Sequence, residues 1–466
     1  MPDTLKRLFS RRDFDVVARH AGTVFVGQLA VMGFGVVDTI VAGRHAQASL
    51  AALSVGSAIF VTVYVSLMGL LQALLPIWSE MHGARRHAAI GPSLRQSLYI
   101  CAMACVPGMA LLFHPEPILR WTEVPAELQA TVQSYLAIVG WSLPAALLFR
   151  IFSTLNQALG RPQLVTWLQA ASLLVKLTLS VWFTFGGFGL QAMGVVGCAW
   201  ATFAVNCFLC ALGLCLLRTQ SLYGPAQIWR PLDRPHGPTL ALFARLGVPA
   251  GLSILVEITS FTLMALYVAR LGTAAAAAHQ IAANVTALMY MVPLSLAIAT
   301  SARASYWRGA GDEARARRVA FMGLAIAMLL ALLLAAIVLA GRTWIVPIYT
   351  HTPEVAAIAL TLLPWVCLYH LADATQTVSI FVLRSYRITL APLLVYCSLL
   401  WGVGLWGGIR LAYRGAGGVA ALQSPIAFWL CAAIGLLLAA ACFVVLLHRV
   451  TAGISTQKEE LSALGT

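Results

Sequence analysis

Apolar runs of about 20 residues, separated by turn signals, recur along the whole chain. A helix needs about that length to cross the hydrocarbon core of a bilayer. The strands of a membrane barrel would instead be segments of about ten residues with alternating polarity. Only 10% of the residues are charged, against about 25% in ordinary soluble domains. The sequence therefore predicts an all-α integral membrane protein.

Twelve of these runs are interpreted as transmembrane helices. They lie at about residues 18–42, 51–78, 94–114, 127–149, 164–186, 192–217, 243–269, 276–302, 319–341, 354–382, 389–409 and 422–447. An even number of spans places both ends of the chain on the same side of the membrane. Segments on that side hold 23 of the 30 Lys and Arg residues, segments on the other side hold 6, and one lies inside a span. Because basic residues concentrate in cytoplasmic segments, both termini are predicted to be cytoplasmic.

The basic residues of these cytoplasmic segments account for the net charge of +14. Basic loops face anionic lipid headgroups, so membrane lipids rather than nucleic acid are the expected partners. The basic start around Lys6 and Arg7 leads into a run that is too long for a cleaved signal peptide. The ten cysteines all lie in apolar runs, where packing is the expected role and disulfides or metal ligands are the alternative.

Paired features recur at a nearly constant spacing. Gly83-Ala-Arg-Arg and Gly309-Ala-Gly-Asp begin equivalent basic loops 226 residues apart, and Arg161 and Arg387 show the same offset. This pattern favours an internal repeat of six spans, with chance similarity between apolar segments as the alternative. Because six is even, the halves run in the same direction, and a transport site is expected between them.

The longest connector, Arg218–Pro238, carries four prolines and three arginines and marks the boundary between the halves. The predicted organisation is an N-terminal lobe at residues 1–218, a cytoplasmic linker at 219–238, a C-terminal lobe at 239–450 and a cytoplasmic tail at 451–466.

Three of the 16 acidic residues, Asp38, Glu257 and Asp373, fall within predicted spans. An ionised side chain at the bilayer centre costs about 2.5–3.5 kcal/mol on insertion scales, so such residues usually face a cavity and function there. One carboxylate can hold a proton, Na⁺ or an organic cation, and these compete for it, which is the physical basis of antiport. For Asp38, near the end of its span, a structural cap or salt bridge is the alternative.

Other polar residues share the spans with these acids. Lys176 is the only basic residue placed deep in a span, where it either pairs with Asp38 or extends toward an interface. Tyr369 lies one helical turn before Asp373 and shares its face. Tyr290 and Asn284 lie on the eighth span, and a tyrosine ring can hold an organic cation. Ordinary helix packing is the alternative for each of these three.

Several motifs, in order along the chain, resemble the multidrug and toxic compound extrusion (MATE) family in its NorM-like bacterial branch. Val37-Asp38-Thr-Ile-Val-Ala-Gly43 is similar to the family pattern V-D-T-x-x-A-G. Ala278-His-Gln-Ile-Ala-Ala-Asn284 contains the H-Q-I-A-x-N part of the family pattern A-x-H-Q-I-A-x-N, and Leu383-Arg-Ser-Tyr-Arg387 is similar to L-R-G-Y-K. Gly247-Val-Pro continuing to Glu257, and Gly194-Val-Val-Gly-Cys, also match family patterns.

The resemblance implies twelve helices in two six-helix lobes that form a V. It implies a bacterial inner-membrane exporter of small organic, mostly cationic compounds, driven by inward Na⁺ or H⁺, without a cofactor and expected to be monomeric. Glu257 and Asp373 match the acids that bind the coupling cation, so Na⁺ is expected at this pair. Tyr369 and Tyr290 stand at matching aromatic positions.

Two residues depart from the family pattern. Thr23 stands where the family has a proline, and Lys176 stands where it has an asparagine that polarises the N-lobe acid. An ammonium group there would neutralise Asp38, so cation coupling is predicted mainly in the C-terminal lobe.

Three other protein classes are the alternatives. A lipid-linked or polysaccharide flippase would share the fold but tends to have a basic cavity and often fourteen spans. A membrane enzyme would need a catalytic loop outside the bilayer, and no connector here exceeds about 25 residues. A major facilitator would carry an acidic residue in its loop motif that Gly83-Ala-Arg-Arg lacks.

Overall fold

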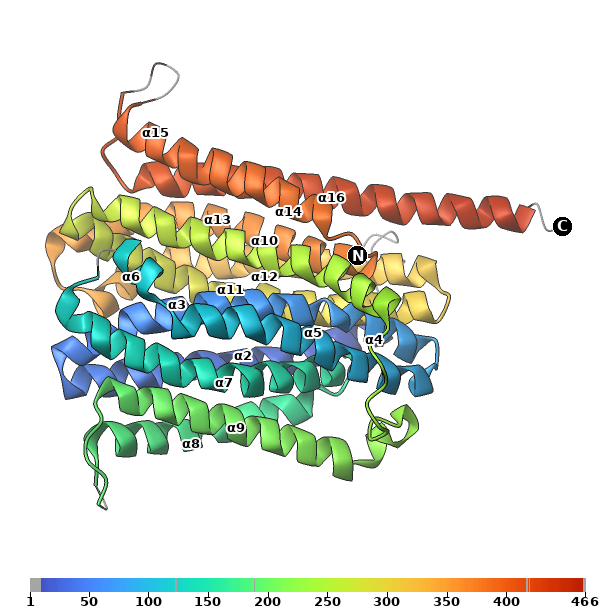
Figure 1. Cartoon of the computed structure of the whole chain (residues 1–466). Coiled ribbons are helices and arrows are strands. Elements are labelled where there is room, and N and C mark those ends of the chain that lie inside the picture. Colours follow the sequence, from blue (N-terminus) through green and yellow to red (C-terminus); the bar gives the residue numbers. More distant parts are fainter. Residues whose placement is uncertain (1–9, 122–123, 188, 416–417, 419, 464–466) are drawn as a thin grey trace. The chain divides into compact units, whose positions relative to one another are not determined.

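A computed structural model describes residues 10–121, 124–187, 189–415, 418 and 420–463. The basic residues Lys6 and Arg7 lie outside this range. Within it the chain is almost entirely helical (Figure 1). Among the described residues, twelve helices are long and apolar enough to cross a membrane, which confirms the predicted all-α fold and the number of spans.

The chain forms two compact units. Thr23–Gly251 make up the N-terminal unit, and Met1–Gly22 together with Leu252–Thr466 make up the C-terminal unit. The unit boundaries fall inside two long helices, α2 (Arg11–His45) and α10 (Gly237–Ala269), so each of these helices contributes residues to both units.

The N-terminal unit is organised around one central helix. Besides its part of α2, it contains α3 (Gln47–Gln72), α4 (Leu74–Gly83), α5 (His87–Phe113), α6 (Glu116–Trp121), α7 (Ala126–Ala158), α8 (Pro162–Phe185), α9 (Val195–Thr219) and the 3₁₀ turn η1 (Ser221–Ala226). Helix α7 packs against α3, α5 and α9. Gly56 permits the contact with α3, because a Cβ atom there would lie 2.7 Å from the ring of Tyr135.

The C-terminal unit is also organised around one central helix. It contains most of α10, then α11 (Thr273–Gly309), α12 (Glu313–Tyr349), α13 (Pro353–Ser385), α14 (Leu390–Tyr396), the π-helix η2 (Cys397–Trp406), α15 (Gly407–Tyr413) and α16 (Ile426–Ala463). Helix α13 packs against α11, α12 and α16. The connection into α12 is local: Gly311 turns the chain at a φ of 82°, and the Asp312 carboxylate caps the helix by accepting from the Arg315 amide.

The helices are mostly longer than the predicted spans, and three differences bear on the sites described below. The span predicted at 51–78 is two helices, α3 and α4, which meet at Ala73. Helix α13 continues to Ser385, so Arg384, assigned from sequence to a cytoplasmic loop, lies in its last turn. Helix α16 continues through most of the predicted tail, to Ala463. Hydropathy detects only the part of a helix that matches the hydrocarbon core, whereas the helix itself extends beyond that layer.

Candidate functional site: a carboxylate pair and a separate ion pair

Helices α10 and α13 bring two of the three predicted acids together in the C-terminal unit. Glu257 comes from α10 and Asp373 from α13, and their carboxyl groups are close enough to interact through their charges. Asp373 is 2% exposed, and Glu257 is half-buried. Two acids that share a low-dielectric region repel each other when both are ionised. The pair therefore favours any cation that can settle beside it.

Asp373 is held by a chain of side-chain hydrogen bonds. The Gln376 Nε2 atom donates to Asp373 Oδ1 at 2.9 Å, and the Thr377 hydroxyl approaches the same oxygen at 3.4 Å. The Tyr396 hydroxyl in turn donates to Gln376 Oε1. Gln376 and Thr377 follow Asp373 by one helical turn, a spacing that places them on its face. Tyr396, which ends α14, could not be assigned to this site from its position in the sequence.

The predicted tyrosines lie beside the acids. Tyr369 and Tyr290 both lie within the range of the charges of Glu257 and Asp373. The Tyr369 ring packs edge-on against Phe261 and Trp429, with ring centroids 5.6 and 5.8 Å away. Such edge-to-face contacts hold a ring in a defined orientation. The site therefore combines two carboxyl groups with fixed aromatic rings.

Asn284 makes its side-chain hydrogen bond outside this cluster. Its side chain is exposed, and its amide oxygen accepts from Gln280 Nε2 at 3.2 Å on the same helix. Among the contacts of the described residues, none joins Asn284 to Glu257 or Asp373. Of the residues predicted for the C-terminal site, four are therefore brought together and Asn284 is not.

Sequence reasoning missed one basic member of the site. Arg384 is 4% exposed, and its guanidinium group interacts electrostatically with Glu257 and Tyr290. It lies over the Phe381 ring at 4.5 Å, and its Nη1 atom has no hydrogen-bond partner among the described residues. A sequence signal exists, because Arg384 follows Asp373 by three helical turns on the same face and helical side chains lean toward the N-terminus.

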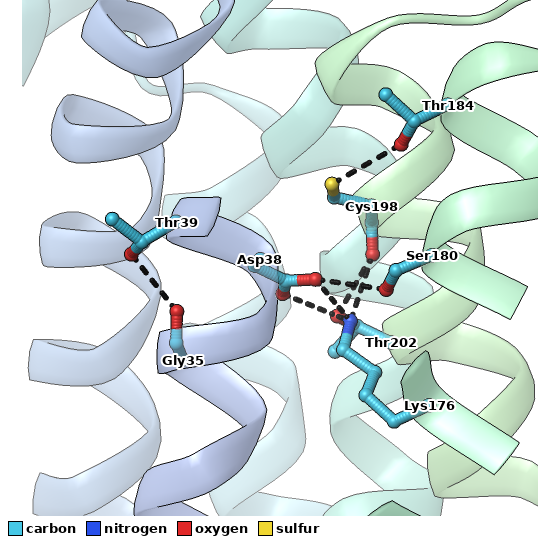
Figure 2. A network of polar contacts seen from close by, with 8 residues as sticks. All are labelled: Gly35, Asp38, Thr39, Lys176, Ser180, Thr184, Cys198 and Thr202. Atoms are coloured by element: carbon cyan, nitrogen blue, oxygen red, sulfur yellow. Dashed lines mark hydrogen bonds and ion pairs between the residues drawn. The ribbon is translucent and has the colours of Figure 1, made fainter. Parts of the chain in front are cut away.

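The third predicted acid lies in the N-terminal unit (Figure 2). Lys176 Nζ of α8 lies 2.7 Å from Asp38 Oδ1 of α2. The ammonium also donates to the Thr202 hydroxyl at 2.6 Å and to the Cys198 carbonyl oxygen at 3.1 Å, both on α9. The Ser180 hydroxyl donates to Asp38 Oδ1 at 3.0 Å. Of the two alternatives for Lys176, the structure has the pairing with Asp38.

The two units thus hold different charge arrangements. In the N-terminal unit one carboxylate faces one ammonium at contact distance. In the C-terminal unit the Glu257 carboxyl group interacts both with a second carboxyl group, that of Asp373, and with one guanidinium group, that of Arg384. With all groups ionised the first set is neutral and the second carries one net negative charge, so only the second attracts a further cation.

A bundle of twelve spans that buries ionisable side chains among aromatic rings has the architecture of a secondary transporter. The family model MatE matches residues 24–182 and again residues 249–406. The chain belongs to the MATE family, as the motifs predict, and it is therefore a multi-pass membrane transporter rather than an enzyme. The two matched segments begin at residues 24 and 249, close to the spacing of the paired features in the sequence.

Individual relatives support the same assignment. A probable multidrug resistance protein NorM of Aromatoleum aromaticum is 36% identical over 426 residues, 91% of each chain. Multidrug resistance protein PmpM of Pseudomonas aeruginosa is 31% identical over 392 residues, which are 84% of this chain and 82% of PmpM.

Solved structures share the fold at low sequence identity. The eukaryotic MATE transporter AtDTX14 is 17% identical with a TM-score of 0.85, over 95% of this chain and 98% of that chain. The Vibrio cholerae MATE transporter VcmN in its bent form is 18% identical with a TM-score of 0.81, over the same shares of the two chains.

Proposed function

We propose that this protein is a multidrug exporter that exchanges organic, mostly cationic compounds for Na⁺ or H⁺, with coupling mainly at Glu257 and Asp373. Export of this kind requires one site where the driving ion and the substrate exclude each other. Two neighbouring carboxyl groups with a single guanidinium group nearby are suited to this, because one added cation balances the remaining negative charge. This juxtaposition is the observation that carries the proposal.

Two further features support an exchange site. Glu257 is half-buried whereas Asp373 is buried, so an arriving cation meets Glu257 first and the pair afterwards. No hydrogen bond to the Glu257 carboxyl group is present among the described residues, which leaves its oxygens available to an ion. The half-buried ring of Tyr290 provides a face that attracts organic cations, and Tyr369 lies beside the acids with its ring buried.

The setting of the proposed exporter follows from the sequence and the relatives. Residues 1–218 and 239–450 would form two lobes that alternate in access, joined by the linker at 219–238. We place the protein in a bacterial inner membrane, with both termini and the tail at 451–466 in the cytoplasm. Membrane lipids would surround a single copy of the chain.

The test is ethidium efflux from a host that lacks its own efflux pumps, with the Na⁺ and proton gradients collapsed in separate experiments. Efflux should stop when one of the two gradients is removed. Glu257→Gln and Asp373→Asn should each abolish efflux, because each replaces an ionisable group by a neutral one of similar shape. Asp38→Asn should have a smaller effect at equal protein levels.

Two outcomes would contradict the proposal. Equal loss of efflux in Asp38→Asn would move the coupling site to the N-terminal unit. Efflux that persists in both Glu257→Gln and Asp373→Asn would remove the carboxylate pair from the mechanism. Gradient-independent movement of a fluorescent lipid-linked sugar, without ethidium efflux, would favour the flippase alternative.

A further inference from the structure

Arg150 of α7 has unpartnered hydrogen-bond donors inside the N-terminal unit. It is 6% exposed, and its Nε and Nη2 atoms are buried without a hydrogen-bond partner. Across the part of the chain that the structure describes, its guanidinium group donates no hydrogen bond. A guanidinium group carries five N–H donors, and buried polar groups almost always have partners. The donors of Arg150 are therefore available to a ligand.

The charge of Arg150 also lacks a counter-charge. Arginine stays ionised in proteins, and an unpaired charge in a low-dielectric interior is costly. Arg95 of α5 is equally buried in the same unit, but it lies 2.8 Å from the Asp233 carboxylate. Among the described residues, no carboxylate lies at ion-pair distance from Arg150. The ionisable group that interacts with it is Tyr64 of α3, and a tyrosine is neutral at neutral pH.

The guanidinium group lines a small pocket between α2, α7 and α8. Its other polar side chains come from all three helices: Gln28 of α2, Ser153 and Gln157 of α7, and Gln169 of α8. The pocket has a volume of about 10 Å³, which corresponds to a single water-sized particle. A carboxylate, a phosphate or a lipid headgroup is too large for this space, whereas a monatomic ion is of the right size.

The glutamine amides add donors of the kind that an anion needs. Gln157 Nε2 donates to the Ser153 hydroxyl at 3.3 Å, whereas Gln157 Oε1 is buried without a partner. A half-turn of this amide would let the hydroxyl donate to Oε1 and would free Nε2 for a ligand. Gln28 and Gln169 are half-buried, so the pocket can be reached from the surface of the unit.

We propose that Arg150 holds a chloride ion in this pocket, with the glutamine amides as additional donors. The ion supplies the negative charge that no described residue provides. An ordered water molecule would also fit the pocket, but it carries no net charge. Only a bound chloride makes the stability of the protein depend on which anion is present. This site is separate from the carboxylate pair and does not rest on the proposed cation exchange.

The experiment follows the thermal unfolding temperature of the purified full-length protein while sodium gluconate is replaced by sodium chloride. Sodium concentration and ionic strength stay constant, so the carboxylate pair of the C-terminal unit sees no change. Chloride and bromide should raise the unfolding temperature saturably, whereas sulfate, which is too large for the pocket, should not. Arg150→Gln should lower the apparent affinity for chloride at least about tenfold.

Arg120→Gln is the matched control. Arg120 is an exposed arginine at the end of α6 in the same unit, and its variant should keep the full response to chloride. If Arg150→Gln does not fold, Arg150→Met is tested in its place, because an uncharged side chain of similar length is better tolerated in an interior. Crystals of the unmodified protein grown in bromide locate the ion directly, since its anomalous scattering should peak beside the Arg150 guanidinium group.

The proposal is overturned if the unmodified protein unfolds at the same temperature in chloride and in gluconate, as an ordered water would predict. It is also overturned if sulfate stabilises the protein as much as chloride, or if the chloride response survives the loss of Arg150. A bromide peak that lies elsewhere would likewise refute the site. None of these outcomes depends on transport, so failure of the proposed function would appear only in the efflux experiment.

Discussion

The Asp13 carboxylate at the start of α2 lies 2.6 Å from the guanidinium group of Arg303 in α11. Its second oxygen, Oδ2, lies 2.7 Å from Arg315 of α12, and the Trp307 indole donates to the first oxygen, Oδ1, at 3.1 Å. Asp13 is only 1% exposed, although the sequence places it in a tail before the first span. These ion pairs bind the first turn of α2 to α11 and α12 within the C-terminal unit.

The first prediction concerns this anchor. Asp13→Asn should lower the free energy of unfolding by about 2 kcal/mol, because it leaves two partly buried guanidinium groups without their counter-charge. Asp15→Asn is the matched control, since Asp15 is exposed two residues further on. Thermal unfolding in detergent measures the difference, and equal unfolding temperatures for the two variants would contradict the prediction.

The second prediction concerns the ion pair of Asp38 and Lys176. Breaking a buried pair from one side costs about 3–5 kcal/mol, whereas replacing both partners by neutral groups is often tolerated. Asp38→Asn and Lys176→Met should therefore each destabilise the protein more than the double variant does. Unfolding temperatures of the four proteins test this, and additive losses would show that the two groups are not coupled.

The third prediction concerns the hydrogen-bond chain from Tyr396 through Gln376 to Asp373. Gln376→Leu removes the 2.9 Å donor to the carboxylate and should change the cation concentration for half-maximal transport by about tenfold. Tyr396→Phe should have a smaller effect in the same direction. Transport in proteoliposomes measures both.

Thr375→Val is the control for this chain. The Thr375 hydroxyl donates to the Leu371 carbonyl of its own helix at 2.8 Å, so the variant changes α13 without touching Asp373. If Thr375→Val shifts the cation dependence as much as Gln376→Leu does, the chain has no special relation to the acid.

The fourth prediction concerns Arg384. Its positive charge opposes cation binding at Glu257, so Arg384→Gln should lower the cation concentration for half-maximal transport by roughly fivefold. Arg318→Gln removes the same charge at an exposed position and should leave this concentration unchanged. A purely structural Arg384 would instead reduce stability and protein yield without shifting the cation dependence.

Sequence reasoning was strongest where the property is local to one helix. A helix of about 20 apolar residues matches the thickness of the hydrocarbon core, and this match does not depend on the neighbouring helices. The spans and their number could therefore be predicted. The shared face of Tyr369 and Asp373 could also be predicted, because it depends only on helical periodicity. Arg384 follows from the same periodicity, but hydropathy ended the span before it.

Relations between helices were decided by the tertiary structure. The sequence identified Asp38, Glu257, Asp373 and Lys176 as costly residues for a membrane interior, since the penalty for a charge belongs to the residue itself. It left open the partner of Lys176 and gave no indication that Asp13 is buried. Which charge meets which depends on how helices from distant parts of the chain pack, and no local pattern encodes that choice. The fold thereby decided that one acid is neutralised by an ammonium group while two others share a site.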